Sequence, residues 1–141
     1  MPKKNEMQIQ FYSQSINEAF ARVAISAFIS QLDPTVEVLY DIKMAVSEAV
    51  TNAIIHGYEN MGKGLVVIKC SYEGKEIEIT VIDEGKGIAS VEEAMKPLYT
   101  TSIEEERAGL GFTVMQEMMD EVEVCSHPGK GTTVKMKKSL E

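Results

Sequence analysis

Residues 65–82 read Leu65-Val-Val-Ile-Lys-Cys-Ser-Tyr72, then Glu73-Gly-Lys75, then Glu76-Ile-Glu-Ile-Thr-Val-Ile82. Both halves are rich in β-branched and apolar residues, and a glycine-containing turn separates them. The stretch therefore predicts a β-hairpin. A hairpin at the centre of the chain indicates a sheet built mainly from antiparallel strands.

The segments before the hairpin predict one strand and two helices. Apolar and polar residues alternate over 7–12, which is typical of a half-exposed strand. Apolar residues at helical spacing predict a helix over about 17–32, which ends where Asp33-Pro34 removes a backbone donor. A second, longer helix is predicted from Pro34 to about His56, because Gly57 supplies a common helix terminus.

The segments after the hairpin predict a long connection, a third helix and two more strands. The connection runs from Asp83 to about 108, with a short helix candidate at 91–95. The helix runs over about 111–120, and the strands cover 123–126 and 132–137. This order predicts one α+β domain over 1–141: a two-layer sandwich with a mainly antiparallel sheet and helices on one face.

Composition excludes several classes of protein. The chain has 141 residues and a formal net charge of -8, which argues against a nucleic-acid partner because affinity for nucleic acid rests largely on positive charge. No apolar run is long enough to cross a membrane, and the first residues do not resemble a signal peptide. Cys70 and Cys125 show no CxxC spacing, so neither a disulfide scaffold nor a zinc site is expected. We therefore expect a cytoplasmic domain.

Glu48 and Asn52 are the first candidate site residues. They lie four positions apart on the second predicted helix, so they share one flank of it. Such a pair could supply a carboxylate base and a neutral oxygen ligand for a hard cation. The spacing is more often that of an ordinary solvated helix edge.

Two glycine-containing segments are the other candidates. Asp83-Glu-Gly-Lys-Gly87 directly follows a predicted strand, where a flat ligand could approach the backbone and the aspartate could accept a hydrogen bond. Arg107-Ala-Gly-Leu-Gly-Phe112 opens the third predicted helix, where free N–H groups could bind an anion. Each is also compatible with an ordinary turn or helix cap. Neither the P-loop nor the GxGxxG pattern is present.

Taken together, these features resemble a known set. Glu48xxxAsn52, Asp83xGly85xGly87, Gly109xGly111 and Gly131-Thr132 are similar in order and spacing to the motifs of the GHKL ATPase/kinase superfamily, which includes gyrase and the histidine kinases. The stretch Ser47-Glu-Ala-Val-Thr-Asn-Ala-Ile-Ile-His-Gly-Tyr58 and the compact length further resemble the anti-sigma factor serine kinases.

The resemblance implies a mixed, mostly antiparallel sheet backed by three helices, and it implies roles for individual residues. Glu48 would be the catalytic general base, and Asn52 would ligate Mg²⁺ through its side-chain oxygen. Asp83 would accept a hydrogen bond from the amino group of adenine in ATP or ADP and reject guanine. Two further sets of cofactor-binding residues follow: Gly85, Gly87 and Thr132 beside the base, and Arg107, Gly109, Leu110 and Gly111 at the phosphates.

The resemblance also implies partners. The protein would bind and inhibit a sporulation sigma factor, sigma factor F, and would phosphorylate a serine of its anti-anti-sigma antagonist. It would form a homodimer, with residues 7–32 at the interface, and residues 88–110 would be an ATP lid. The alternatives are a paralogous kinase of a stress-response sigma factor and an interaction module that needs no nucleotide. We do not expect a histidine kinase or a gyrase-like ATPase, because 141 residues are too few to add the helical hairpin or the transducer domain that those proteins need.

Overall fold

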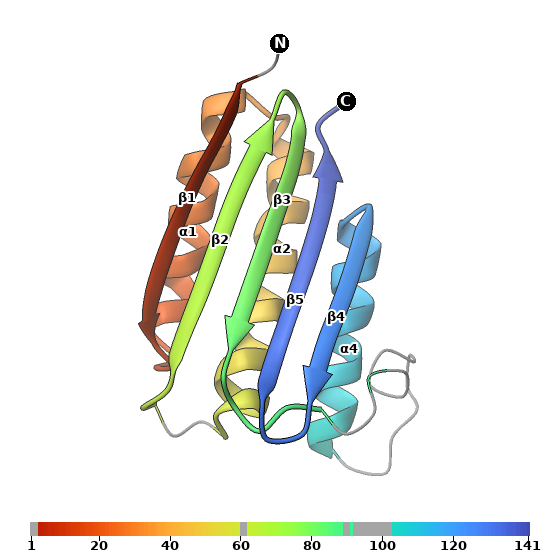
Figure 1. The fold of residues 1–141 in the computed structure, drawn as a ribbon. Coiled ribbons are helices and arrows are strands. Elements are labelled where there is room, and N and C mark those ends of the chain that lie inside the picture. The colour runs from red at the N-terminus through yellow and green to blue at the C-terminus, as the bar shows by residue number, and fades with distance from the viewer. Residues whose placement is uncertain (1–2, 60–61, 89–90, 92–102) are drawn as a thin grey trace.

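The computed structural model describes residues 3–59, 62–88, 91 and 103–141, and of 103–109 it describes the backbone. The elements run in the order β1 (Lys4–Tyr12), α1 (Asn17–Ile29), η1 (Ser30–Leu32), α2 (Val36–Asn52), η2 (Ala53–Gly57), β2 (Leu65–Glu73), β3 (Glu76–Asp83), α4 (Ile103–Met118), β4 (Glu121–His127) and β5 (Gly131–Ser139). Both chain ends lie at the same end of the molecule (Figure 1).

The five strands form one sheet in the order β1-β2-β3-β5-β4. The four pairings between these strands are all antiparallel. The hairpin prediction is confirmed, with Val66 opposite Asp83 at its open end. On the other side of β3, Asp83 lies opposite Thr132. The register thus sets two candidate site residues side by side.

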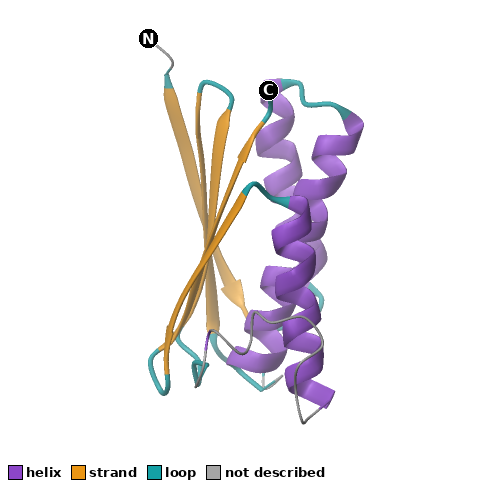
Figure 2. Cartoon of the chain, turned by 90° about the vertical axis from the view of Figure 1, so that its right-hand side faces the viewer, coloured by secondary structure: helices purple, strands orange, loops and turns teal. Residues whose placement is uncertain are grey.

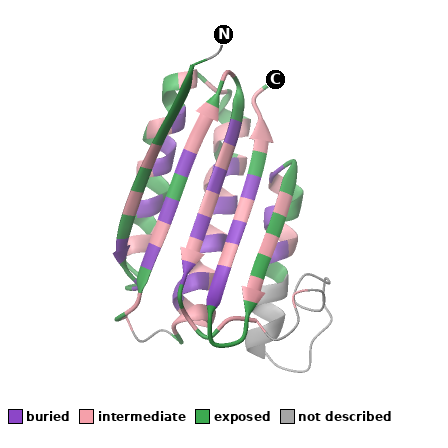
Figure 3. Ribbon diagram, viewed as in Figure 1, coloured by how far each residue is buried: buried purple, intermediate pink, exposed green. Residues whose placement is uncertain are grey.

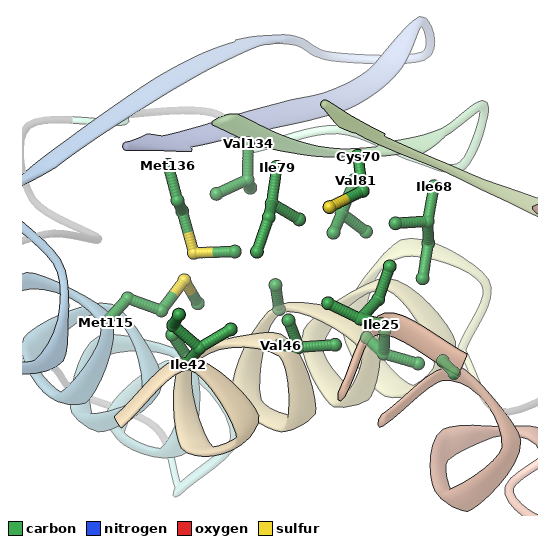
Figure 4. Close-up of a cluster of buried hydrophobic side chains, with 14 of the residues drawn as sticks. Ile25, Ile42, Val46, Ile68, Cys70, Ile79, Val81, Met115, Val134 and Met136 are labelled. Carbon is green, nitrogen blue, oxygen red and sulfur yellow. The ribbon is translucent and has the colours of Figure 1, made fainter. Parts of the chain in front are cut away.

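The helices cover one face of the sheet (Figure 2), and the predicted two-layer α+β class is confirmed. Buried and exposed residues alternate along the strands (Figure 3), because successive side chains point to opposite faces. The buried residues of β2, β3 and β5 meet Ile25, Ile42, Val46 and Met115 of the helices (Figure 4). The described helices include none long and apolar enough to cross a membrane.

The second helix ends in an irregular turn. Thr35 begins α2 as a cap, its hydroxyl accepting a hydrogen bond from the Val38 N–H at 3.2 Å. After Asn52 the chain continues as the π-helical turn η2, residues Ala53–Gly57, in which each turn holds an extra residue. Such turns are rare and often lie at functional sites. The predicted helix to His56 is thus confirmed in extent, with a different geometry in its last turn.

The prediction for the third helix is wrong at its start. α4 begins at Ile103 and not near Gly111. The run Glu104-Glu-Glu-Arg-Ala108 consists of good helix formers, and a single interior glycine costs only about 1 kcal/mol, so the helix continues through Gly109 and Gly111. The short helix predicted over 91–95 and most of the predicted lid, 88–110, lie outside the fully described residues.

Candidate functional site

The candidate residues gather at the end of the molecule opposite both termini, where α2 and β3 end and β5 begins (Figure 1). They form two neighbouring groups. One surrounds a cavity between α2 and α4, and the other lies at the ends of β3 and β5. Because η2 follows α2 and reaches the end of β3, this turn joins the two groups.

The first group lines a cavity of about 240 Å³. Glu48 and Asn52 stand on its α2 wall, and Leu110 and Gly111 stand on its α4 wall. The spacing argument for Glu48 and Asn52 is therefore confirmed: the two side chains share one helix flank, and that flank is a cavity wall. The remaining lining residues are Thr51, Ile55, His56 and Val114.

Glu48 is half-buried, and its environment favours the protonated form. Burial raises the pKa of its carboxyl, and the negative charge of Glu18 on α1 raises it further. Glu18 is held in place by two neighbours. It accepts a hydrogen bond from the hydroxyl of Ser47 and forms an ion pair with Arg22 at 3.5 Å. A carboxyl whose pKa moves upward in this way is suited to proton transfer near neutral pH.

Asn52 carries a polar atom without a hydrogen-bond partner. Its buried side-chain nitrogen Nδ2 is unsatisfied, which is costly in a folded protein. Among the described residues, no group of three His, Cys, Asp or Glu could hold a metal alone. Mg²⁺ commonly takes one or two protein oxygens and completes its shell with water and substrate phosphates. Asn52 lines the cavity beside Glu48, and its side-chain oxygen is a ligand of the kind that fits this pattern, whereas the unsatisfied nitrogen is a donor and cannot ligate a cation.

Gly111 leaves room beside both of these side chains. A Cβ atom built on Gly111 would lie 3.1 Å from Glu48 Oε2 and 3.1 Å from Asn52 Nδ2, so any larger residue would crowd the cavity. Gly109 and Gly111 lie inside α4, however, and not at its beginning. The expected anion site at a helix N-terminus is therefore absent at these glycines in the described helix. Arg107 and Gly109 lie on the α4 backbone, and the Arg107 side chain is outside the described residues.

Asp83 is the centre of the second group. Its side chain is only 7% exposed, and burial raises the pKa of its carboxyl to about 6. Backbone N–H groups of Gly85 and Thr132 lower that pKa in part, and the bond from Gly85 N to Asp83 Oδ1 is 2.9 Å long. The carboxylate is thus fixed in direction, and no cation of the described residues forms an ion pair with it, so it is ready to accept from a neutral donor.

The loop after Asp83 packs so closely against neighbouring backbone that its two glycines, Gly85 and Gly87, leave no room for a side chain. A Cβ on Gly85 would lie 2.0 Å from the carbonyl oxygen of Gly57, and one on Gly87 would lie 2.0 Å from that of His127. One on Gly131 would lie 2.1 Å from the carbonyl oxygen of Asp83. Gly87 and Gly131 also have positive φ angles, which favour glycine. These glycines bring three backbone segments together around Asp83.

Thr132 lies beside Asp83 and is 8% exposed. Its hydroxyl lies 2.8 Å from the Ser126 hydroxyl, which in turn accepts a hydrogen bond from Ile88 N at 2.8 Å. Ser126, Gly57 and Glu18 are site residues that the sequence does not identify as such. Gly57 is typical of a helix terminus, and no local pattern marks Ser126 or Glu18.

The sequence profile described as the histidine kinase-like ATPase domain matches residues 14–138. The protein named anti-sigma F factor of Thermoanaerobacter sp. (strain X514) is 61% identical over 140 residues, covering 99% of this chain and 97% of the relative. The chain belongs to the anti-sigma F family of histidine kinase-like ATPases. A further member, the anti-sigma F factor of Clostridium acetobutylicum, is 56% identical over 137 residues, covering 97% of this chain and 95% of the relative.

Solved structures share the fold of this anti-sigma F family member. The RsbU and RsbW domains of a Mycobacterium tuberculosis protein superpose with a TM-score of 0.71 at 20% identity, over 96% of this chain and 32% of that one. The catalytic domain of the histidine kinase ThkA superposes with a TM-score of 0.58 at 15% identity, over 95% of this chain and 96% of that one. At these identities the likeness concerns the fold alone.

Proposed function

We propose that this protein is an anti-sigma factor that binds and inhibits sigma factor F and, with Mg-ATP, phosphorylates a serine of its anti-anti-sigma antagonist. Family membership supports the use of ATP by a kinase-type domain. The name shared by relatives at 55–61% identity supports the sigma-factor role. The observation that carries the proposal is the cavity in which Glu48 and Asn52 lie close to Gly111, a residue whose missing side chain leaves room for a ligand.

In this proposal the residues of the cavity catalyse transfer of a phosphoryl group from ATP to the serine of the antagonist. Glu48 accepts the proton of the attacking serine hydroxyl, and its raised pKa brings its basicity closer to that needed near neutral pH. Asn52 holds Mg²⁺, which offsets phosphate charge when it is bound. Leu110 and Gly111 border the phosphate region, and Arg107 and Gly109 are proposed to extend it.

The second group would recognise the base. Asp83 accepts a hydrogen bond from the exocyclic amino group of adenine, while guanine offers a carbonyl oxygen at that position and leaves Asp83 unpaired. Gly85 and Gly87 leave space for the ring, and Thr132 lies beside it. ATP and ADP are therefore the proposed nucleotides, and GTP is rejected.

The decisive experiment compares Glu48→Gln with wild type and with Glu37→Gln, an exposed glutamate in the first turn of the same helix. We expect Glu48→Gln to lower phosphorylation of the antagonist by about 10²- to 10⁴-fold, because general base catalysis typically contributes that much. Binding of Mg-ADP, measured by calorimetry, should stay within about twofold, since Gln keeps the shape of Glu. A Glu48→Gln protein that phosphorylates at the wild-type rate would refute the role.

Calorimetry with ATP and ADP, together with capture of each sigma factor with and without nucleotide, separates the alternatives. An interaction module that needs no nucleotide would bind neither ATP nor ADP and would hold the sigma factor equally well without them. A kinase paralogue directed at a stress-response sigma factor would bind nucleotide but would capture that sigma factor in preference to sigma factor F.

We also propose a homodimer that uses the N-terminal strand and helix. β1 is an edge strand, so one side of its backbone has no partner strand in the sheet. Tyr12 at the end of this strand, Ile16 just before α1, and Phe20 and Val23 on α1 are all more than half exposed. An unpaired edge next to an apolar helix stripe is typical of an interaction surface. Sedimentation equilibrium of the purified protein tests this, and a monomer at micromolar concentration would exclude it.

A further inference from the structure

The turn that follows α2 makes contacts beyond the cavity. η2 ends at Gly57, and the N–H of Tyr58 donates to the carbonyl oxygen of Ala53 at 3.1 Å, which closes the turn. Asn52 at one end of this turn lines the cavity, and Tyr58 at the other end reaches the strands. This short turn therefore separates the proposed metal ligand from the neighbourhood of Asp83.

The Tyr58 hydroxyl bridges two strand ends. It donates a hydrogen bond to the carbonyl oxygen of Leu65 at 2.6 Å, where β2 begins. It accepts one from the N–H of Glu84 at 2.6 Å, directly after β3 ends. The ring lies against Gly64, where an added Cβ would come within 2.2 Å of it. Tyr58 thus fastens the residue that follows Asp83 to the start of the neighbouring strand.

The preceding residue holds the same loop through its backbone. The carbonyl oxygen of Gly57 accepts a hydrogen bond from Lys86 N at 2.9 Å. A Cβ on Gly57 would lie 2.8 Å from the carboxyl carbon of Asp83, so only glycine lets the turn come this close. The loop from Asp83 to Lys86 is therefore held from one side by two successive residues, Gly57 and Tyr58.

We propose that Tyr58 is a positioning residue for adenine recognition, which fixes the loop that carries Asp83 relative to the cavity that holds the phosphates. The inference rests on the proposed function, because it assigns Asp83 to the base. Tyr58 touches neither Glu48 nor Asn52 through any hydrogen bond among those described. Its loss should therefore weaken nucleotide binding without slowing the transfer itself.

Tyr58→Phe is the test, because it removes both hydrogen bonds and keeps the ring packed against Gly64. We expect the KM for ATP and the Kd for ADP to rise about tenfold, in line with the loss of one or two hydrogen bonds. At saturating ATP, the kcat for phosphorylation of the antagonist should stay within about twofold of the wild-type value. The preference for ATP over GTP should fall, because a loosened Asp83 discriminates less.

Tyr72→Phe is the matched control. The Tyr72 hydroxyl lies at the far end of β2 and accepts a hydrogen bond from Asn5 Nδ2 at 2.9 Å. Its removal should leave KM, Kd and nucleotide preference unchanged. If kcat falls in Tyr58→Phe while the KM for ATP is constant, the substitution has reduced the fraction of active protein and has not changed how ATP is positioned. That result would overturn the inference.

Amide hydrogen exchange provides a readout that needs no nucleotide. In Tyr58→Phe we expect the amides of Glu84 and Lys86 to exchange about tenfold faster, while the amide of Ile79 in the middle of β3 stays protected. If these loop amides exchange as in wild type, Tyr58 does not hold the loop and the inference fails. If wild type binds no adenine nucleotide, the proposed function fails instead, and the exchange rates still decide whether the loop is held.

Discussion

The buried carboxyl of Asp83 should make the protein less stable as pH rises, and Asp83→Asn should remove that dependence. Burial raises the pKa of Asp83 from its ordinary value of 3.8 to about 6. A group whose pKa is raised by folding contributes stability that is fully present below the unfolded-state pKa and is lost as pH rises through the folded-state pKa. The cost of ionising Asp83 in the folded state therefore grows between about pH 4 and pH 6 and stays constant at higher pH.

The size of the effect follows from the two pKa values. The cost is about 1.5 kcal/mol at pH 5 and reaches about 3 kcal/mol at pH 8, where the ionised form dominates in both states. The side chain is 7% exposed, so solvent screens little of this cost. The Asp83→Asn variant has a pH-independent cost of its own, because the amide hydrogens of the new side chain are cut off from water. The change in relative stability between the two pH values is thus the quantity to measure, about 1.5 kcal/mol.

Urea unfolding at pH 5 and pH 8 measures this difference, with both proteins at one protomer concentration because dimerisation would shift apparent stability. From pH 5 to pH 8 the stability of Asp83→Asn relative to wild type should rise by about 1.5 kcal/mol. Compared with wild type, the variant should also bind ADP about tenfold or more weakly. Asp33→Asn, at an exposed aspartate, should change neither quantity. A relative stability that is the same at both pH values would refute the assignment of an ionisation cost to Asp83.

Two further predictions follow from the packing and charge of the site. Gly85→Ala should destabilise the fold by about 2 kcal/mol or more in urea unfolding, because its Cβ would meet the backbone oxygen of Gly57 at 2.0 Å. Gly129→Ala, whose Cβ meets nothing within 4 Å, should cost only the strain of its positive φ, about 1 kcal/mol, and equal costs would argue against the close approach. Phosphorylation should slow as pH falls through the raised pKa of Glu48, and Glu18→Gln should move this acid limb to lower pH because it removes the negative charge that helps to raise that pKa. An acid limb at the same pH in both proteins would show that Glu18 does not influence the base.

Much of the fold could be predicted from local patterns. The hairpin of β2 and β3 and the extents of α1 and α2 depend on periodicity and on residues that stop a helix, all of which are local. The start of α4 could not be predicted in this way. Glycines near a chain turn suggest a helix boundary, whereas the helix-forming run before Gly109 carries the helix back to Ile103, well before the predicted start.

The site divides along the same line. Glu48 and Asn52 share a flank because four residues are about one helical turn, and Asp83 follows a strand that the sequence pattern reveals. Ser126 and Glu18 reach the site from other elements, through contacts with Thr132 and Ser47. Only the packing of α1 on α2 brings Glu18 to Ser47, so no spacing along the chain indicates that pair. Ser126 lies opposite Thr132 across the β4–β5 hairpin, so this pair follows once the register of the hairpin is known.

Gly57 shows why the two groups of the site belong to one unit. As a helix terminus it could be replaced by Asn with little loss, since Asn also ends helices. In the fold it has a second requirement, because a Cβ there would lie 2.8 Å from the Asp83 carboxyl and its carbonyl oxygen must accept from Lys86. A side chain at this position would push the loop that carries Asp83 away from η2, the turn that borders the cavity. The backbone of this turn at Gly57 and the Tyr58 hydroxyl that follows it therefore set the distance between the proposed adenine and phosphate positions together.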